Sequence, residues 1–324
     1  MKIAILGAGK IASVMAKTMK QMEEVNCYAI AARDYTRAKE FAEEYGFQKA
    51  YGSYEEMVQD QEVELVYIAT PHSHHYEHAK LCLEHGKHVL CEKAFTINAK
   101  EAKALINLAR EKKLLLAEAI WTRYMPSRER INEVLASGII GTPHTLTANL
   151  GYVIAHKPRI IEPSLAGGAL LDIGIYPINF ALMAFGDEIE SMTTAATLSS
   201  TGVDLQNSIT FKYKDGKMAI LNSTTLALTN REGVISGDKG YMIVENINNC
   251  ERIRVFSNER IEIQNFMMPN QISGYEYEVR ACIKAIKEGK LECEEMPHAE
   301  TLRVLEIMDQ LRKEWGVCYP QEQK

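Results

Sequence analysis

The fold is decided by the stretch Lys2-Ile3-Ala4-Ile5-Leu6-Gly7-Ala8-Gly9-Lys10-Ile11-Ala12, at the start of the sequence. An apolar run that ends at glycine is typical of a strand buried on both faces. After it, apolar residues recur at helical spacing from Ile11 to Met19. The sequence therefore predicts a strand over 2–6, a tight turn, and a helix over 11–22.

Glycines in this turn follow the spacing G-x-G-x-x-A. Gly7 permits the tight turn, Gly9 lets the backbone approach a pyrophosphate, and Ala12 allows close packing of the helix on the strand. The helix N-terminus offers N–H groups and a positive dipole end to phosphate. The turn therefore predicts a dinucleotide site, the alternative being a merely structural turn.

Strands and helices alternate over the first 120 residues. Capping boxes at Ser53 with Glu56, and at Asn98 with Glu101, predict two helix starts. The other helices are expected over 36–45, 73–85 and 99–112, and the other strands over 26–32, 63–69, 88–91 and 114–119. This alternation predicts an α/β Rossmann domain, a doubly wound parallel sheet, over residues 1–121.

The pattern changes in residues 122–324. Segments with a period near two and many Thr and Val residues predict antiparallel strands. They cover 145–153, 191–199, 207–213, 218–228, 240–245 and 252–256, with helices over 127–137, 177–185, 275–288 and 298–315. We expect an α+β domain built on a large, mostly antiparallel sheet.

Composition excludes several classes of protein. The 324 residues carry 37 Lys+Arg and 43 Asp+Glu, a net charge of −6, with 46% hydrophobic residues. This balance argues against disorder and against a nucleic-acid or anionic-membrane partner. The apolar runs over 25–32 and 114–120, taken as the longest, are too short to span a bilayer. Seven scattered cysteines without a CxxC pair indicate a reducing, cytoplasmic location.

The residues at the end of the second predicted strand indicate whether the protein prefers NADP or NAD as its cofactor. Arg33 stands at the position that decides, and Arg37 lies one helical turn later. An arginine there pairs with a 2′-phosphate, whereas an acidic residue accepts from a ribose hydroxyl. The sequence favours NADP, but Asp34 keeps NAD possible, and Arg37 is equally compatible with a solvated helix surface.

The third and fourth strands end in polar turns, where ligands bind in open α/β sheets. Thr70-Pro71 follows the third strand, and Glu92-Lys93 follows the fourth. We expect Lys93 beside the nicotinamide, the alternative being a surface lysine. In the histidine-rich segment, His75 is expected to line the cofactor site, His74 to face substrate, and His78 to lie on the helix surface; no metal site is expected.

Several motifs in order resemble the Gfo/Idh/MocA oxidoreductase family, closest to the branch of dimeric dihydrodiol dehydrogenases and NADP-dependent D-xylose dehydrogenases. They are Gly7-x-Gly9-x-x-Ala12, Thr70-Pro71 with His75, Glu92-Lys93, Glu118 to Tyr124, Gly167 to Tyr176, and Met296 to Glu300. The family's E-K-P is Glu92-Lys93-Ala94 here, and the Asn of its T-P-N is His72.

The resemblance implies roles by position. Tyr176 stands where many members have a catalytic histidine, Trp121 and Arg123 lie over the cofactor and the active-site mouth, and Arg33 contacts the 2′-phosphate. The second-domain sheet implies a homodimer. The cofactor-binding residues expected in all are Gly7, Gly9, Lys10, Ile11, Arg33, Arg37, Thr70, Pro71, His75, Glu92, Lys93, Trp121 and Arg123. Those expected for substrate are His74, Trp121, Tyr152, Asp172 and Tyr176.

The residue chemistry suggests a mechanism with Lys93, Tyr176 and Asp172 as catalytic residues. Hydride transfer at an alcohol carbon needs a base for the hydroxyl proton and positive charge near the oxygen. Tyr176 serves as base with Lys93 lowering its pKa from about 10, or Lys93 carries the proton itself. Asp172, four residues earlier, shares a helix face with Tyr176 and holds substrate or Lys93, or else is a helix N-cap.

These expectations lead to an NADP-preferring dehydrogenase acting on a small polyol, an aldose or a dihydrodiol. Two alternatives stay open, a dinucleotide-binding sensor without catalysis and an NAD-dependent glycoside hydrolase of the same fold.

Overall fold

The computed structural model describes residues 1–323, which form two compact units. The first unit comprises Met1–Tyr124 and Gln271–Leu305, and the second comprises Met125–Asn270 and the residues from 306 onward. The chain thus leaves the first unit and returns to it. The boundary predicted at 121/122 divides the chain once. In the structure residues 271–305 also belong to the first unit, where α9 (Glu276–Lys287) buries one of its faces.

A six-stranded parallel sheet forms the first unit, in the order β3-β2-β1-β4-β5-β6. The order reverses between β1 and β4, which is the topological switch point where such sheets bind ligands. The strands are β1 (Lys2–Leu6), β2 (Asn26–Ala31), β3 (Lys49–Tyr51), β4 (Leu65–Ile68), β5 (His88–Glu92) and β6 (Leu116–Ala119).

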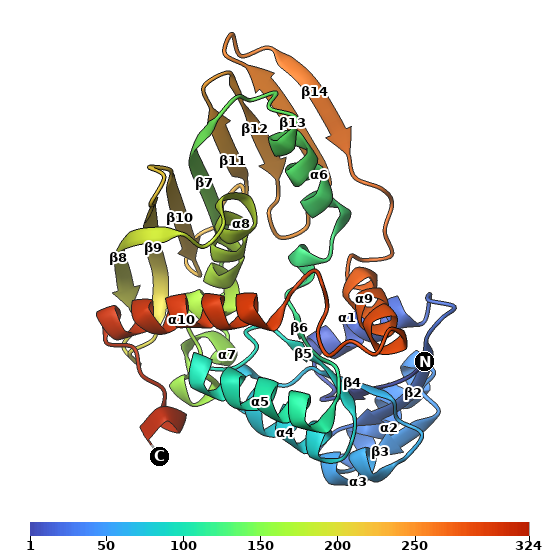
Figure 1. Ribbon diagram of the computed structural model, residues 1–324. Coiled ribbons are helices and arrows are strands. Elements are labelled where there is room, and N and C mark those ends of the chain that lie inside the picture. The colour runs from blue at the N-terminus through green and yellow to red at the C-terminus, as the bar shows by residue number, and fades with distance from the viewer. Residues whose placement is uncertain (324) are drawn as a thin grey trace. The chain divides into compact units, whose positions relative to one another are not determined.

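Helices connect these strands (Figure 1). They pack in neighbouring pairs, α1 beside α2 and α4 beside α5, as the right-handed crossovers of a doubly wound sheet require. Their bounds are α1 (Lys10–Met19), α2 (Tyr35–Tyr45), α3 (Tyr54–Gln59), α4 (His75–Glu84) and α5 (Ala99–Lys112), with short 3₁₀ turns η1 (His72–His74) and η2 (Trp121–Arg123). Both predicted helix starts are confirmed, since Ser53 accepts from the Glu56 N–H and Asn98 from the Glu101 N–H as N-caps.

An eight-stranded sheet forms the second unit, in the order β14-β13-β12-β11-β7-β10-β9-β8. The helices α6 (Pro126–Ala136) and α8 (Ile175–Phe185) pack beside each other, and α8 contacts β7 and β10. The strands are β7 (Pro143–Gly151), β8 (Ile189–Leu198), β9 (Asp204–Tyr213), β10 (Met218–Thr224), β11 (Gly233–Gly237), β12 (Gly240–Glu245), β13 (Arg252–Ser257) and β14 (Glu262–Met267). The remaining elements are α7 (Pro158–Ile161), η3 (Pro163–Leu165), the π-helical turn η4 (Leu170–Gly174), α10 (His298–Trp315), which begins in the first unit, and η5 (Pro320–Gln323).

The predicted fold class is confirmed, and several details differ. The strands β3, β11 and β14 were not predicted. β7 and β10 pair in parallel, although every other neighbouring pair in that sheet is antiparallel. Helix α1 ends at Met19, three residues before the predicted end.

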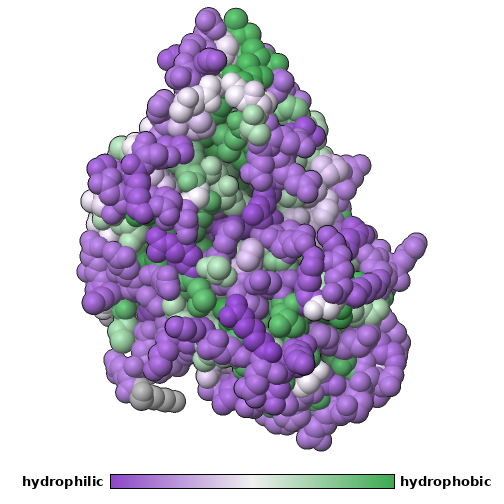
Figure 2. Space-filling view, in the orientation of Figure 1, coloured by the Kyte–Doolittle hydropathy of each residue, from purple (hydrophilic) through white to green (hydrophobic). Residues whose placement is uncertain are grey.

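One apolar stretch was overlooked in the sequence. Pro163–Phe185 is long and apolar enough to cross a membrane, but 89% of its most apolar window is buried inside the structure. Such burial is typical of a helix in the core of a folded domain, and α8 is buried along almost its whole length. The visible surface is mainly hydrophilic (Figure 2), with hydrophobic residues gathered near the tip of the second unit where β13 and β14 meet; Ile261, between these strands, is 62% exposed.

Candidate active site

The glycine turn has the backbone that a pyrophosphate needs. Gly7 has φ +101°, and a Cβ there would lie 2.9 Å from Thr70 Cγ2 and 3.1 Å from Ala69 O. A Cβ at Gly9 would meet only Ala69 O, at 3.8 Å. Gly9 caps α1 without a side-chain hydrogen bond, so no capping side chain takes the first N–H groups, at Lys10 and Ile11. The turn therefore fits a dinucleotide phosphate.

Asp34 serves its own helix. Its side chain accepts a hydrogen bond from the Thr36 N–H, at 2.9 Å, as the N-cap of α2. Arg37, exposed on α2, donates to Ala8 O at 2.5 Å, which ties α2 to the glycine turn. Arg33 lies close enough to His74 and His78 for its charge to lower the pKa of each. Both arginines thus lie at the edge of the sheet where β1 and β4 end.

The histidines after β4 hold the turn together. Buried His75 places Nδ1 2.8 Å from Ala94 O and Nε2 2.8 Å from Thr70 O, so its ring bridges the turns that follow β4 and β5. Burial lowers the pKa of His75, which favours the neutral ring. His74 is half-buried, with Nδ1 2.9 Å from Ser73 Oγ. Pro71 is exposed at the start of this turn.

The prediction that His78 lies on the helix surface is wrong. Its Nδ1 lies 2.9 Å from Thr70 Oγ1, and its ring stacks on His74 and packs edge-on against Tyr54. Burial lowers the pKa of His78 to about 4, with the charges of His74, His75 and Arg33 acting in the same direction. The residue is therefore a neutral part of this turn.

The Glu92-Lys93 turn follows β5, as predicted. Glu92 is buried; its Oε1 accepts a hydrogen bond from the Tyr67 hydroxyl and its Oε2 accepts from the Lys93 N–H at 3.2 Å. The Lys93–Ala94 peptide bond is cis. The sequence pattern indicated only a strand position for Tyr67 of β4 and not its hydrogen bond to Glu92. Burial and the charges of Glu92 and Glu278 hold the pKa of Tyr67 well above its usual value, so its hydroxyl remains a donor.

Trp121 and Arg123 contact residues of 271–305, the second part of the first unit. Trp121 stacks on Tyr275 with ring centroids 4.3 Å apart and planes 6° from parallel. Arg123 is 1% exposed and forms an ion pair with Glu300 of α10. The sequence placed Arg123 at the active-site mouth; in the first unit its guanidinium is instead buried against a carboxylate that lies far along the chain.

Asp172 and Tyr176 lie in the second unit at a change of helix type. Asp172 is in the π-helical turn Leu170–Gly174, and Tyr176 is in the first turn of α8. Asp172 is therefore not an N-cap, and the α-helix expected over both residues covers only Tyr176. Asp172 pairs with Arg159 of α7 at 2.5 Å, a partner that no pattern in the sequence indicated. Tyr152, just after β7, accepts from Asn248 Nδ2 at 3.2 Å.

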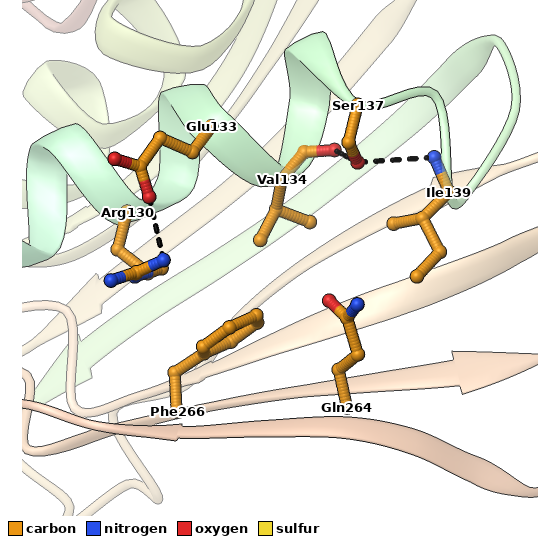
Figure 3. Close-up of a pocket in the computed structure, with 7 residues that line it drawn as sticks. All are labelled: Arg130, Glu133, Val134, Ser137, Ile139, Gln264 and Phe266. Carbon is orange, nitrogen blue, oxygen red and sulfur yellow. Dashed lines mark hydrogen bonds and ion pairs between the residues drawn. The ribbon is translucent and has the colours of Figure 1, made fainter.

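A groove lies on the second unit away from these residues (Figure 3). It has a volume of about 540 Å³ and lies between α6 and β14. Arg130 stands over the Phe266 ring at 4.7 Å and pairs with Glu133 at 2.6 Å. Its lining includes none of the predicted site residues.

A glycine turn at the switch point of a parallel sheet is typical of a dinucleotide-binding protein, and Lys93 directly follows β5 at the same edge. Residues 1–119 match the oxidoreductase family with an NAD-binding Rossmann fold, and residues 129–243 match the C-terminal domain of the same family. The chain belongs to the Gfo/Idh/MocA oxidoreductase family and is an NAD(P)-dependent dehydrogenase or reductase acting on CH–OH groups.

Similar proteins cover almost the whole chain. Trans-1,2-dihydrobenzene-1,2-diol dehydrogenase of Homo sapiens is 36% identical over 330 residues, with 99% of this chain and 98% of the relative covered. The same enzyme of Xenopus tropicalis is 36% identical over 331 residues, covering 98% and 99%. A 3-ketoreductase from Actinomadura kijaniata, in complex with NADP and TDP-benzene, shares the fold with a TM-score of 0.88 at 23% identity, covering 97% of each chain.

Proposed function

We propose that the chain is an NADP(H)-preferring dehydrogenase that transfers a hydride between the nicotinamide and a hydroxyl-bearing carbon of a small polyol, of the aldose or dihydrodiol type. The observation that carries the proposal is the place of Lys93, which directly follows β5 at the same sheet edge as the glycine turn. The names of the relatives support the substrate class, since two are dihydrodiol dehydrogenases and a levoglucosan dehydrogenase in complex with NADH and levoglucosan shares the fold, with a TM-score of 0.86 at 19% identity, covering 98% of this chain and 97% of that one.

Proton transfer is the task of the chain's own residues. The bound cofactor supplies the hydride acceptor or donor. Tyr176 takes the hydroxyl proton during oxidation and returns it during reduction. The Lys93 ammonium stabilises negative charge on the reacting oxygen and favours the phenolate. Asp172, neutralised in part by Arg159, accepts from a second substrate hydroxyl.

The hydrogen bonds and charges of the residues after β2 support a preference for NADP. The Asp34 carboxylate already accepts the Thr36 N–H, which leaves it poorly placed for a ribose hydroxyl. Arg33 and Arg37 provide positive charge at the same edge of the sheet. Guanidinium groups pair strongly with phosphate, so this arrangement supports a 2′-phosphate site.

Two substitutions test the mechanism. Lys93→Met should abolish turnover while NADPH still binds, and Tyr176→Phe should lower kcat by orders of magnitude. Turnover is followed at the nicotinamide absorbance across a panel of aldoses, inositols and dihydrodiols, and binding by quenching of protein fluorescence. Near-normal kcat in both variants would contradict the mechanism.

The same panel separates the alternatives. A sensor would bind the cofactor without turnover of any substrate. A glycoside hydrolase would consume glycosides with no net change in nicotinamide absorbance. Either result would replace the dehydrogenase proposal.

Homodimer formation through the second sheet is part of the proposal. Met218 and Ile220 of β10 are 40% and 41% exposed, and their register neighbours on β7 are Thr145 and Thr147. Short polar and apolar side chains on an exposed sheet face suit a partner sheet. Ile220→Lys should convert the dimer to a monomer in light scattering, whereas Lys212→Glu should weaken it less.

A reducing compartment is also proposed. All seven cysteines are free, including Cys282 and Cys293, whose sulfurs lie 3.8 Å apart without a bond. Cell fractionation tests the cytoplasmic location.

A further inference from the structure

A chain of buried hydrogen bonds in the second unit joins the sheet to the turn before Asp172. Ser223 of β10 donates to Asn207 Oδ1 at 2.9 Å, and Asn207 Nδ2 donates to Asp204 Oδ2 at 2.9 Å. The Leu170 N–H donates to the same Asp204 oxygen at 2.8 Å. The three side chains are 1%, 3% and 0% exposed, so no solvent replaces these bonds.

Two glycines make room for the ends of this chain. Gly168 has φ +122°, and a Cβ there would lie 2.4 Å from Asp204 Oδ1. A Cβ at Gly174 would lie 3.0 Å from Ser223 Oγ. These glycines flank the π-helical turn Leu170–Gly174, so the hydrogen-bond chain contacts both sides of the turn that contains Asp172.

Asp204 satisfies the first backbone donor of a long helical stretch. Leu170 begins the π-turn that continues into α8, and the N–H groups at such a start lack partners within the helix. A carboxylate supplied by a different strand satisfies one of them and complements the positive end of the helix dipole. Burial raises the pKa of Asp204 to about 6, while the Asn207 and Leu170 donors act in the opposite direction.

We propose that Asp204 is a positioning residue for catalysis, which fixes the turn Leu170–Gly174 and thereby the places of Asp172 and Tyr176. The inference rests on the proposed function, because it takes these two residues as catalytic. Asp204 itself contacts backbone and Asn207, so it acts only through the helix.

Asp204→Ala tests the role by removing the oxygen that accepts from both donors. The Leu170 N–H and the Asn207 amide then lose this acceptor, and the hydrogen-bond chain ends at Asn207. We expect kcat to fall about 10- to 100-fold, as a small displacement of catalytic groups does. The dissociation constant of NADPH should stay within about twofold, because the two bonds that are lost are those to Leu170 and Asn207 and not bonds of the glycine turn.

Asp204→Asn distinguishes the hydrogen bonds from the charge. With its amide oxygen in the place of Oδ2, the asparagine still accepts from the Leu170 N–H and from Asn207 Nδ2, while the carboxylate charge is removed. Both donors keep an acceptor, so kcat should stay within about threefold of the parent. The control Asp215→Asn changes an exposed turn aspartate that bonds Lys217, and its kcat should equal that of the parent.

Hydrogen exchange at the Leu170 amide gives a readout that does not depend on the substrate. Exchange should be faster in Asp204→Ala and as slow as in the parent in Asp204→Asn. Unchanged kcat and unchanged exchange in Asp204→Ala would overturn the inference, as would an Asp204→Asn variant no better than Asp204→Ala. Where Asp204→Ala does not fold, Ser223→Ala removes the far donor and should give a smaller change of the same kind. A parent protein without turnover would contradict the proposed function, and the exchange measurement would still decide the role of Asp204.

Discussion

Tyr67→Phe removes one hydroxyl group from the interior of the first unit. Tyr67 is 1% exposed, and its hydroxyl donates to Oε1 of Glu92, which is 6% exposed. The ring stays in place in the variant, because phenylalanine fills the same volume. The substitution therefore isolates one hydrogen bond to a buried carboxyl group beside Lys93.

The loss of stability can be estimated from the type of bond. A hydrogen bond to a charged group contributes about 1.5–3 kcal/mol, and a neutral one about 0.5–1.5 kcal/mol. We expect Tyr67→Phe to lower the free energy of unfolding by about 2 kcal/mol. The matched control is Tyr124→Phe, because the Tyr124 hydroxyl is also buried but donates to the neutral Glu118 carbonyl at 2.8 Å. Its loss should be about 1 kcal/mol.

Urea unfolding followed by tryptophan fluorescence measures both losses in the unit concerned. The chain has two tryptophans, Trp121 in the first unit and Trp315 in the second. A Trp315→Phe background leaves Trp121, stacked on Tyr275, as the reporter of the first unit. Equal losses in the two tyrosine variants, or a larger loss in Tyr124→Phe, would refute the reasoning that Tyr67 serves a charged partner.

Three further predictions concern the first unit. Asp34→Ala should cost about 1 kcal/mol of unfolding free energy as a lost N-cap and leave the ratio of NADP to NAD affinity unchanged; a shifted ratio in cofactor titrations would mean that Asp34 contacts ribose. Arg33→Ala should lower the NADP over NAD preference in kcat/KM about 10- to 100-fold, from one charge-assisted interaction, and an unchanged preference would exclude Arg33 from the phosphate site. Burial raises the pKa of Glu118 to about 7 from an ordinary 4.5, so its contribution to stability is complete below pH 4.5 and is lost as the pH rises through 7. Glu118→Gln should therefore lose less stability than the parent between pH 5 and pH 8 in urea titrations, and parallel profiles would contradict this.

Local patterns predicted the first sheet well. Apolar runs ending near glycine or proline placed β1 and β4, and side chains at Ser53 and Asn98 located helix starts through bonds made within a few residues. β3 was missed because it has only three residues, too few to show a period. β14 was missed because an exposed edge strand needs no apolar face, and its polar and apolar residues do not alternate with a period of two.

Long-range partners could not be predicted in the same way. The family resemblance implied a place for Arg123 at the active-site mouth; its ion-pair partner, Glu300 of α10, lies 177 residues away along the chain, and no local pattern indicates it. Arg159 carries no motif, yet it pairs with Asp172. The parallel pairing of β7 with β10 likewise depends on which strands meet in space, which the period of each strand does not encode. The catalytic and binding roles of the site residues stay predictions for the assays above.

The return of the chain to its first unit has a consequence for synthesis on the ribosome. Residues 1–124 emerge early, but Glu300 and Thr301, which pair with Arg123 and Glu118, emerge only after the whole span 125–270. Until then a guanidinium and a carboxyl group meant for the interior have no such partners, and an unpaired buried charge is costly. We expect the packing of the first unit around Arg123 and Glu118 to be completed only after residues 271–305 have emerged.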